Sequence, residues 1–241
     1  MRLAKIRLPW LIFTLLVFIA LVKLGLWQND RALEKEQRLI RIEQLNLQAK
    51  VSLDSIVTLH NKSSEEINDF PVLLKGVFLD DALFLLDNQV NKGQLGYRVL
   101  QIFLVDHYAV LVNLGWVLGS IDRNILPNVS AIKGSFSLTG HVRIVEPGIL
   151  LMQQSFEKNK WPVRVQQIEL DKFSTLIDRE LLPFVVYLDT NSNVGYKKNW
   201  QPIVMPPEKH RGYAFQWFSL ALAWLSLMAW SAGIFKKTEK K

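Results

Sequence analysis

Apolar residues dominate the segment from Leu8 to Leu26, where Thr14 and Lys23 are the only polar or charged side chains. At 1.5 Å per residue, a helix of this length crosses the roughly 30 Å hydrocarbon core of a bilayer. A cleavable signal peptide would have a shorter apolar region ending in small residues of the Ala-x-Ala type, whereas this run ends in Leu-Gly-Leu-Trp-Gln. We therefore predict an uncleaved transmembrane helix over residues 8–27.

A second long uncharged run extends from Gly212 to Phe235. It follows a proline pair, Pro206-Pro207, and the basic cluster Lys209-His-Arg211. Prolines end any preceding regular structure, and the run after them is again long enough to cross a bilayer. We predict a second transmembrane helix over residues 212–235, with a return segment over 191–211 leading into it.

Between the two apolar runs, the pattern changes from a helical period to a strand-like period. Residues 31–50 are rich in Glu, Lys, Gln and Leu, which predicts an amphipathic helix over about 30–50 that continues from the first membrane helix. From about residue 70 to 190, short β-branched and aromatic runs alternate with turn signals. We expect a mainly antiparallel β domain, barrel-like or sandwich-like with minor helices (α+β), flanked by two transmembrane α-helices. The expected strands cover 72–78, 82–89, 96–104, 108–117, 134–145, 164–168 and 184–188, with a polar loop over 60–66 and a short helix over about 171–179.

The net charge of +7 is concentrated outside the central domain. Residues 1–7 and 236–241 each contribute +3 and Lys23 adds one, whereas 21 Lys and Arg residues balance 21 Asp and Glu residues over 28–211. A neutral domain gives no support to nucleic-acid binding. Short basic tails mark the cytoplasmic side, so we expect both termini there and the 28–211 domain across the membrane. That space is the bacterial periplasm or the mitochondrial intermembrane space, and the lack of an Arg- and Ser-rich presequence favours a bacterial inner membrane.

The sequence contains no recognisable catalytic or metal-binding motif. Cysteine is absent, which excludes disulfides, thiolate ligands and cysteine nucleophiles. The four histidines, His60, His107, His141 and His210, have no i, i+3 or i, i+4 spacing, and no His-Glu-x-x-His, Gly-x-Ser-x-Gly or P-loop pattern occurs. We therefore expect a protein that acts by binding and is not an enzyme.

Four polar clusters remain as candidate binding sites. They are Asp87-Asn-Gln89 with Gly96-Tyr97, Asn113-Leu-Gly115-Trp116, Arg164-Val-Gln-Gln167, and Lys209-His-Arg-Gly-Tyr213. The simplest interpretation of the first three is that their amides and glycines satisfy turns and strand ends.

The sequence resembles the surfeit locus family of cytochrome c oxidase assembly proteins. The matching elements occur in order along the chain: Leu24-Gly-Leu-Trp-Gln28 with Arg31, Asn88-Gln89 with Gly96-Tyr97, Val110-Leu-Val-Asn-Leu-Gly-Trp-Val117, Pro183-Phe184, Trp200-Gln-Pro202 and Pro207-Glu-Lys-His-Arg-Gly-Tyr-Ala-Phe-Gln-Trp217. One departure is Leu114, which stands where the family usually has arginine. The resemblance implies a non-enzymatic biogenesis factor that helps to place haem a in subunit I of the oxidase. It also implies subunit I, haem a synthase and the lipid bilayer as partners.

In some bacterial members of that family, a histidine at the start of the second helix is proposed to bind haem, and the matching residue here is His210. If the second helix already includes this residue, His210, Trp217 and Trp224 recur every seven residues and share a face, beside Ala214 and Ala221. A neutral imidazole is a common axial ligand of haem iron. The resemblance therefore makes haem a a candidate transient cofactor.

The small residues beside these aromatic side chains leave a shallow groove that suits another helix or a flat ring. Gln216 is the one amide in the apolar span, so we expect it to face protein. Interfacial anchoring, or packing of this face on the first helix, is the alternative interpretation. Contact with a partner is the role that we expect. The candidate partner-binding residues are Gln89, Tyr97, Asn113, Gly115, Trp116, Tyr213, Gln216, Trp217 and Trp224.

Two other function classes fit the same architecture. A structural scaffold of envelope complexes would need the membrane helices and the domain without any involvement of haem. A membrane-tethered envelope hydrolase would use scattered Ser, His and Asp residues of the large domain.

Overall fold

The computed structural model describes residues 8–62, 67–145 and 161–232, so the two predicted cytoplasmic tails, 1–7 and 236–241, lie outside the described residues. The chain divides into two compact units. The helical unit consists of Met1–Arg41 and Ile203–Lys241, and the β unit consists of Ile42–Pro202.

The first helix, α1 (Leu8–Asn46), is one uninterrupted helix of 39 residues where the sequence suggested two consecutive segments. At 1.5 Å per residue it is roughly 60 Å long, about twice the thickness of a hydrocarbon core. Among the described residues it is the one helix that is both long and apolar enough to cross a membrane. Its last five residues, 42–46, belong to the β unit.

The second long helix, α4 (Pro207–Ser231), begins five residues before the predicted start at residue 212. Pro206 precedes it with extended backbone, and Pro207 occupies the start of the helix. A proline suits this position because its fixed φ is already helical and its missing N–H would have no partner in the first turn. The helix therefore includes His210 in its first turn and Arg211 directly after it.

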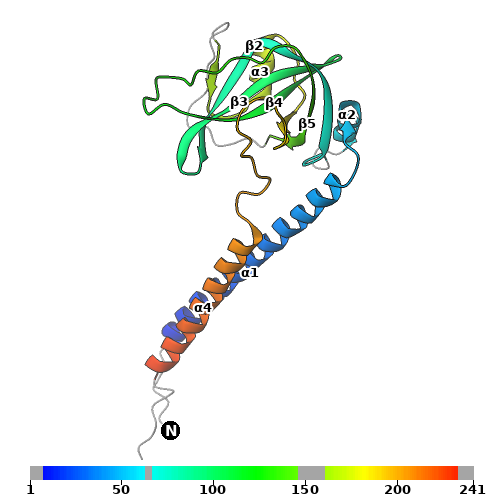
Figure 1. Cartoon of the computed structure of the whole chain (residues 1–241). Helices are drawn as coiled ribbons and strands as arrows, with labels where there is room; N and C mark the ends of the chain where they lie inside the picture. Colours follow the sequence, from blue (N-terminus) through cyan, green and yellow to red (C-terminus); the bar gives the residue numbers. More distant parts are fainter. Residues whose placement is uncertain (1–7, 63–66, 146–160, 233–241) are drawn as a thin grey trace, which may run out of the picture. The chain divides into compact units, whose positions relative to one another are not determined.

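The β unit closes its sheet on itself (Figure 1). Its elements are β1 (Val51–Ser52), α2 (Leu53–Lys62), β2 (Pro71–Asn91), β3 (Gln94–Val105), β4 (Tyr108–Leu118), β5 (Ser135–Ile144), β6 (Val163–Val165), α3 (Leu170–Ile177) and β7 (Phe184–Leu188). Pairing runs from β2 through β3, β4, β7 and β5 and returns to β2. Five strands thus form a closed circuit.

The sheet is mixed, whereas the sequence suggested a mainly antiparallel one. β7 lies parallel to β4, and β1 and β6 each pair in parallel with β2. The other neighbours in the circuit are antiparallel. The alternation of apolar and polar residues is the same in both directions, so it predicts strands without fixing their orientation.

The strand β2 makes the closure possible. It is a single strand of 21 residues where the sequence suggested two, over 72–78 and 82–89. Its first part pairs with β5 and its later part with β3, and the register with β3 shifts between Phe78 and Leu83. An irregularity of this kind bends a strand and re-aims its side chains.

Two apolar clusters stabilise the closed sheet. The inner cluster gathers side chains from all five strands of the circuit, including the fully buried Leu74, Phe103 and Val186. The outer cluster lies between the sheet and α3 with β6, where the rings of Phe84 and Phe173 stack at 4.1 Å. Strands with both faces covered read as nearly continuous apolar runs, as seen in β3 and β4. The predicted polar loop over 60–66 is helical up to Lys62 because α2 covers the inner cluster with Leu53 and Ile56.

Candidate functional site

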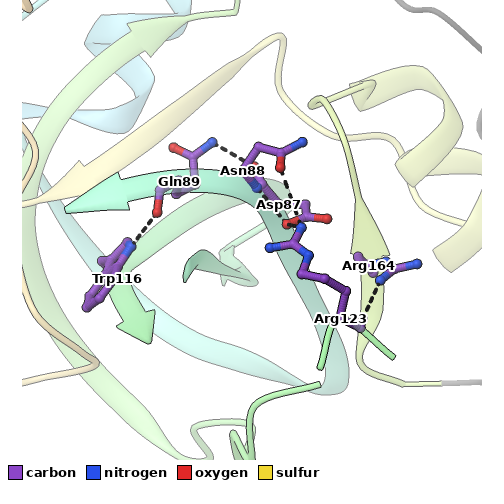
Figure 2. Close-up of polar contacts among 6 residues, drawn as sticks. All are labelled: Asp87, Asn88, Gln89, Trp116, Arg123 and Arg164. Carbon is purple, nitrogen blue, oxygen red and sulfur yellow. Dashed lines mark hydrogen bonds and ion pairs between the residues drawn. The ribbon is translucent and has the colours of Figure 1, made fainter. Parts of the chain in front are cut away.

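Gln89 and Trp116 meet although they belong to strands separated by β3 (Figure 2). The indole Nε1 of Trp116 donates a hydrogen bond to the backbone oxygen of Gln89 at 2.8 Å. The ring reaches that far because it crosses β3 at Gly96, where an added Cβ would lie only 2.6 Å from the indole. Position 96 therefore requires a glycine, because any larger residue would collide with the Trp116 ring.

Arg123, from the segment between β4 and β5, connects this pair to the rest of the cluster. Its guanidinium contacts the carboxylate of Asp87 at 2.5 Å and lies 5.6 Å from the ring centre of Tyr97. Arg164 of β6 donates to the backbone oxygen of Arg123 at 2.9 Å (Figure 2). Asn88, at φ 58°, places its own amide oxygen 3.4 Å from the same guanidinium. Arg123 thus joins two sequence clusters that looked separate, and the hydrogen bond from Trp116 to Gln89 joins the third.

The side chain of Gln89 extends the cluster towards Arg98 of β3. Its Oε1 accepts a hydrogen bond from Arg98 Nε at 2.9 Å, and its Nε2 donates to the backbone oxygen of Asp87 at 2.9 Å. The Arg98 guanidinium lies 5.7 Å from the ring centre of Tyr187 on β7. Burial lowers the pKa of Arg98, and the phenol of Tyr187 partly offsets this effect. Arg98 is therefore a cation held in a partly desolvated site.

Asn113 and Gly115, in the second half of β4, line a small hollow together with Arg98. Asn113 is 3% exposed, and its Oδ1 accepts from the backbone N–H of Gly115 at 2.9 Å. Gly115 has φ +117°, and a Cβ there would lie 2.7 Å from the carbonyl carbon of Tyr196. Only glycine accommodates both the conformation and the contact. The adjacent Leu114 is fully buried in the inner cluster.

The segment 195–200 takes the place of β7 beside the last residues of β4. Tyr196 N–H donates to the oxygen of Leu114 at 2.7 Å, and Trp116 N–H donates to the oxygen of Lys197 at 2.8 Å. This pairing turns Lys198 inward, where its ammonium donates to two backbone oxygens of residues 194 and 196. Burial lowers the pKa of Lys198. The domain site thus combines two partly buried cations with several amides.

This arrangement favours recognition over bond-making chemistry. In the described ranges, no three His, Asp or Glu side chains gather as metal ligands. The aligned groups of the cluster are guanidinium, ammonium, amide and indole N–H donors, which bind oxygen acceptors. Tyr97 is 1% exposed, so its ring packs in the sheet interior, where it also makes a cation–π contact with Arg123. Trp116 is 6% exposed, so it too is a buried member of the cluster.

The second candidate site lies in the helical unit, where α4 packs antiparallel on α1. His210 is 9% exposed, and its Nδ1 lies 2.8 Å from Oε1 of Gln28. An amide oxygen accepts hydrogen bonds, so this contact places the proton on Nδ1 and leaves the lone pair on Nε2. At the other end, Trp224 Nε1 donates to the backbone oxygen of Thr14 at 3.0 Å.

The seven-residue repeat of α4 therefore faces α1. Ala214 and Ala221 are buried on that face, and Trp217 is half-buried between them. Small residues allow two helices to approach closely, and large ones fill the space beside them. The predicted groove is occupied by α1 along this face.

Tyr213 and Gln216 lie on the outer side of α4. Tyr213 is 43% exposed, and Gln216 is also exposed. We expected Gln216 to face protein, but its side chain is exposed within the helical unit. Arg211, also exposed, pairs with Glu36 of α1 at 2.6 Å.

The structure brings together Gln89, Tyr97, Asn113, Gly115 and Trp116 in the β unit, and His210, Trp217 and Trp224 on one face of α4. Sequence reasoning missed the residues that link the first group. Arg98 directly follows the Gly96-Tyr97 pair and could have been found from that position. Arg123 and Lys198 lie in segments without a local pattern, so nothing in the sequence marked them.

Comparisons with known proteins identify the family. No curated protein matches the chain. Residues 15–222 match the SURF1 family, a range that runs from the first turns of α1 through the whole β unit to the middle of α4. This family of assembly factors is associated with cytochrome oxidase assembly and is generally non-catalytic. The resemblance seen in the sequence is confirmed: the chain belongs to the SURF1 family.

Proposed function

We propose that this protein is a membrane-anchored assembly factor that assists the insertion of haem a into subunit I of cytochrome c oxidase, acting by binding and not by catalysis. The observation that carries the proposal is the family match over residues 15–222, which includes the whole β unit and most of both long helices. The donor-rich cluster of the β unit supports a binding role. Subunit I and haem a synthase are the proposed partners.

The proposal includes two membrane crossings. α4 has 25 residues, and the sequence from Gly212 to Phe235 contains no charge. Polar side chains of α4 hydrogen-bond to backbone and side-chain groups of α1. Such bonds between helices are favoured where hydrocarbon offers no other partner. With short basic segments at both ends of the chain, both termini are cytoplasmic and the β unit is periplasmic in a bacterial inner membrane.

This topology can be tested because the chain has no cysteine. Single cysteines placed at Ser120 or Asn128 should react with a membrane-impermeant thiol reagent in intact cells. A cysteine at Lys5 or Lys240 should react only after the membrane is opened. Labelling of either tail in intact cells would contradict the two-pass arrangement.

His210 has the donor chemistry that a haem iron requires. Gln28 holds its Nδ1, and Nε2 makes no hydrogen bond within the described part of the chain. A second group that fixes the ring and its tautomer is the usual support of a ligating histidine. His210 would hold the iron of haem a, while Gln28 would orient the imidazole. Haem a would itself be the cargo delivered to subunit I.

Deletion of the gene tests the assembly function. The amount of cytochrome c oxidase and its haem a absorption band should both fall, whereas other respiratory enzymes should keep their activity. Unchanged oxidase would refute the proposal. A loss of several unrelated envelope complexes, with normal haem a in the remaining oxidase, would instead favour a general scaffold.

The role of His210 is tested on protein purified in detergent from a host that makes haem a. A Soret band should accompany the wild-type protein and weaken in His210→Ala, whereas the matched variant His107→Ala, in the exposed turn after β3, should retain it. Gln28→Leu should reduce the band by less than His210→Ala because it removes only the orienting contact. A colourless wild-type protein would remove haem binding from the proposal and leave the partner role.

A further inference from the structure

A small hollow lies beside β4, between the strand and the segment 198–200. Its walls are formed by Arg98, Asn113, Gly115, Tyr187, Leu188, Lys198, Asn199 and Trp200. It adjoins a larger cavity of about 500 Å³, with which it shares Leu188, Lys198 and Trp200. The hollow itself is about 10 Å³, room for one water or one oxygen atom of a ligand, and the 500 Å³ cavity has room for the remainder of a small molecule.

The charges around the hollow are unbalanced. Arg98 and Lys198 both line it, and neither pairs with a carboxylate in the described part of the chain. The two acidic residues of the adjoining cavity form ion pairs with other cations: Asp189 with Lys50 at 2.9 Å, and Asp69 with Arg143 at 2.8 Å. Two partly desolvated cations without a counter-charge create a site that an anion would stabilise.

The amides point to the same conclusion independently. Asn113 is 97% buried, yet its Nδ2 has no hydrogen-bond partner, and the buried Oδ1 of Asn199 in the same hollow also has none. An unpaired buried donor is costly, and native sites usually satisfy it with a ligand or solvent. An acceptor oxygen in the hollow would satisfy Asn113 Nδ2, whereas Asn199 Oδ1 needs a separate donor such as a water.

We propose that the hollow and its mouth bind the oxyanion of a small organic acid, a carboxylate or phosphate group. One oxygen of the group enters the hollow towards Arg98 and Asn113, and the rest of the group lies at the mouth, which Lys198 lines. The body of the acid lies in the 500 Å³ cavity against Trp200. Both segments that lead out of the β unit, residues 42–50 and 198–202, contribute to the cavity, so an acid bound there contacts both connections to the helices. The proposal does not depend on a role in oxidase assembly.

The test is calorimetric titration of the full-length protein in detergent with inorganic phosphate and, separately, with benzoate, at constant ionic strength set by sodium chloride. One saturable site per chain is expected. Arg98→Gln and Lys198→Met should each weaken binding by about tenfold or more, the usual effect of losing a charged hydrogen bond. Lys197→Met is the matched control because it removes the same charge one residue away, where the ammonium lies over the Trp116 ring and outside the hollow.

Asn113→Asp provides a second readout that needs no ligand. The carboxylate keeps an acceptor for Gly115 N–H and brings a negative charge next to Arg98 and Lys198. It should raise the melting temperature and abolish phosphate or benzoate binding. Binding of phosphate alone would assign a phosphate group as the ligand, and binding of benzoate alone a carboxylate. The proposal is overturned if neither anion binds, if Lys197→Met weakens binding as much as Lys198→Met, or if Asn113→Asp lowers the melting temperature.

Discussion

Replacing Gly115 by alanine tests how the sheet and the segment 195–200 are held together. Gly115 has φ +117°, and a Cβ at this position would lie 2.7 Å from the carbonyl carbon of Tyr196 and 2.8 Å from the oxygen of Lys197. These are backbone atoms, so no side-chain rotation can relieve the overlap. The segment must move away from β4.

The expected cost follows from these contacts. A non-glycine residue at positive φ costs roughly 1–2 kcal/mol. Moving the segment also breaks the hydrogen bond from Tyr196 to Leu114 at 2.7 Å and that from Trp116 to Lys197 at 2.8 Å, at about 1 kcal/mol each. Gly115→Ala should therefore destabilise the β unit by about 3–4 kcal/mol, equivalent to a melting temperature roughly 10 °C lower for a unit of this size.

Thermal unfolding of the detergent-solubilised chain measures this change, and limited trypsin digestion reports where it occurs. Cleavage after Lys197 and Lys198 should become faster than in the unaltered protein. Gly93→Ala is the matched control because Gly93 also has positive φ, +78°, but a Cβ there meets nothing within 4 Å. It should cost only about 1 kcal/mol and leave trypsin cleavage unchanged. Equal destabilisation by the two alanines would refute the steric argument.

Two further substitutions test polar contacts of the β unit. Gln101→Leu removes the hydrogen bonds that Gln101 makes with the backbone N–H and oxygen of Ile132 and with the backbone oxygen of Leu79. The free energy of unfolding measured in urea should fall by about 3 kcal/mol, and a decrease below about 1 kcal/mol would count against these bonds. At Asp189, burial by itself raises the pKa, but contacts with His141, Lys50 and a threonine outweigh it and hold the pKa well below its ordinary value. Its stabilisation is therefore present above about pH 4 and declines as the pH falls further: Asp189→Asn should be less stable by about 2 kcal/mol at pH 7, with a difference that shrinks from pH 5 to pH 3, and a constant difference would contradict this assignment.

The outer limits of the longer strands could be predicted from the sequence, whereas the strand expected over 164–168 is only Val163–Val165 and β1 was not predicted. β7 lies at the predicted residues 184–188, and the expected strand over 134–145 corresponds to β5. Alternation reports which residues have a buried face, so it locates strands well. It could not reveal that 72–78 and 82–89 belong to one bent strand, because the bend depends on pairing with two different neighbours.

The candidate site was predictable only in fragments. Gln89, Gly96 and Trp116 stood out as residues typical of turns and strand ends, and the structure joins them through a hydrogen bond from Trp116 to Gln89 that passes over Gly96. Arg123 joins the cluster from a segment without regular pattern. No local rule links residues 87 and 123, since their proximity results from the closure of the sheet.

The linear chain was enough to predict the apolar segment at 8–27, the position of the β-rich region, the neutral charge of the central domain and the family. These properties depend on composition and local period, which the linear chain contains in full. The three-dimensional fold was needed to show that the face of His210, Trp217 and Trp224 packs on α1, and that Arg98 and Lys198 meet in one hollow. Those contacts join residues about 100 or more positions apart, and they exist only because a closed sheet and an antiparallel helix pair bring distant segments together.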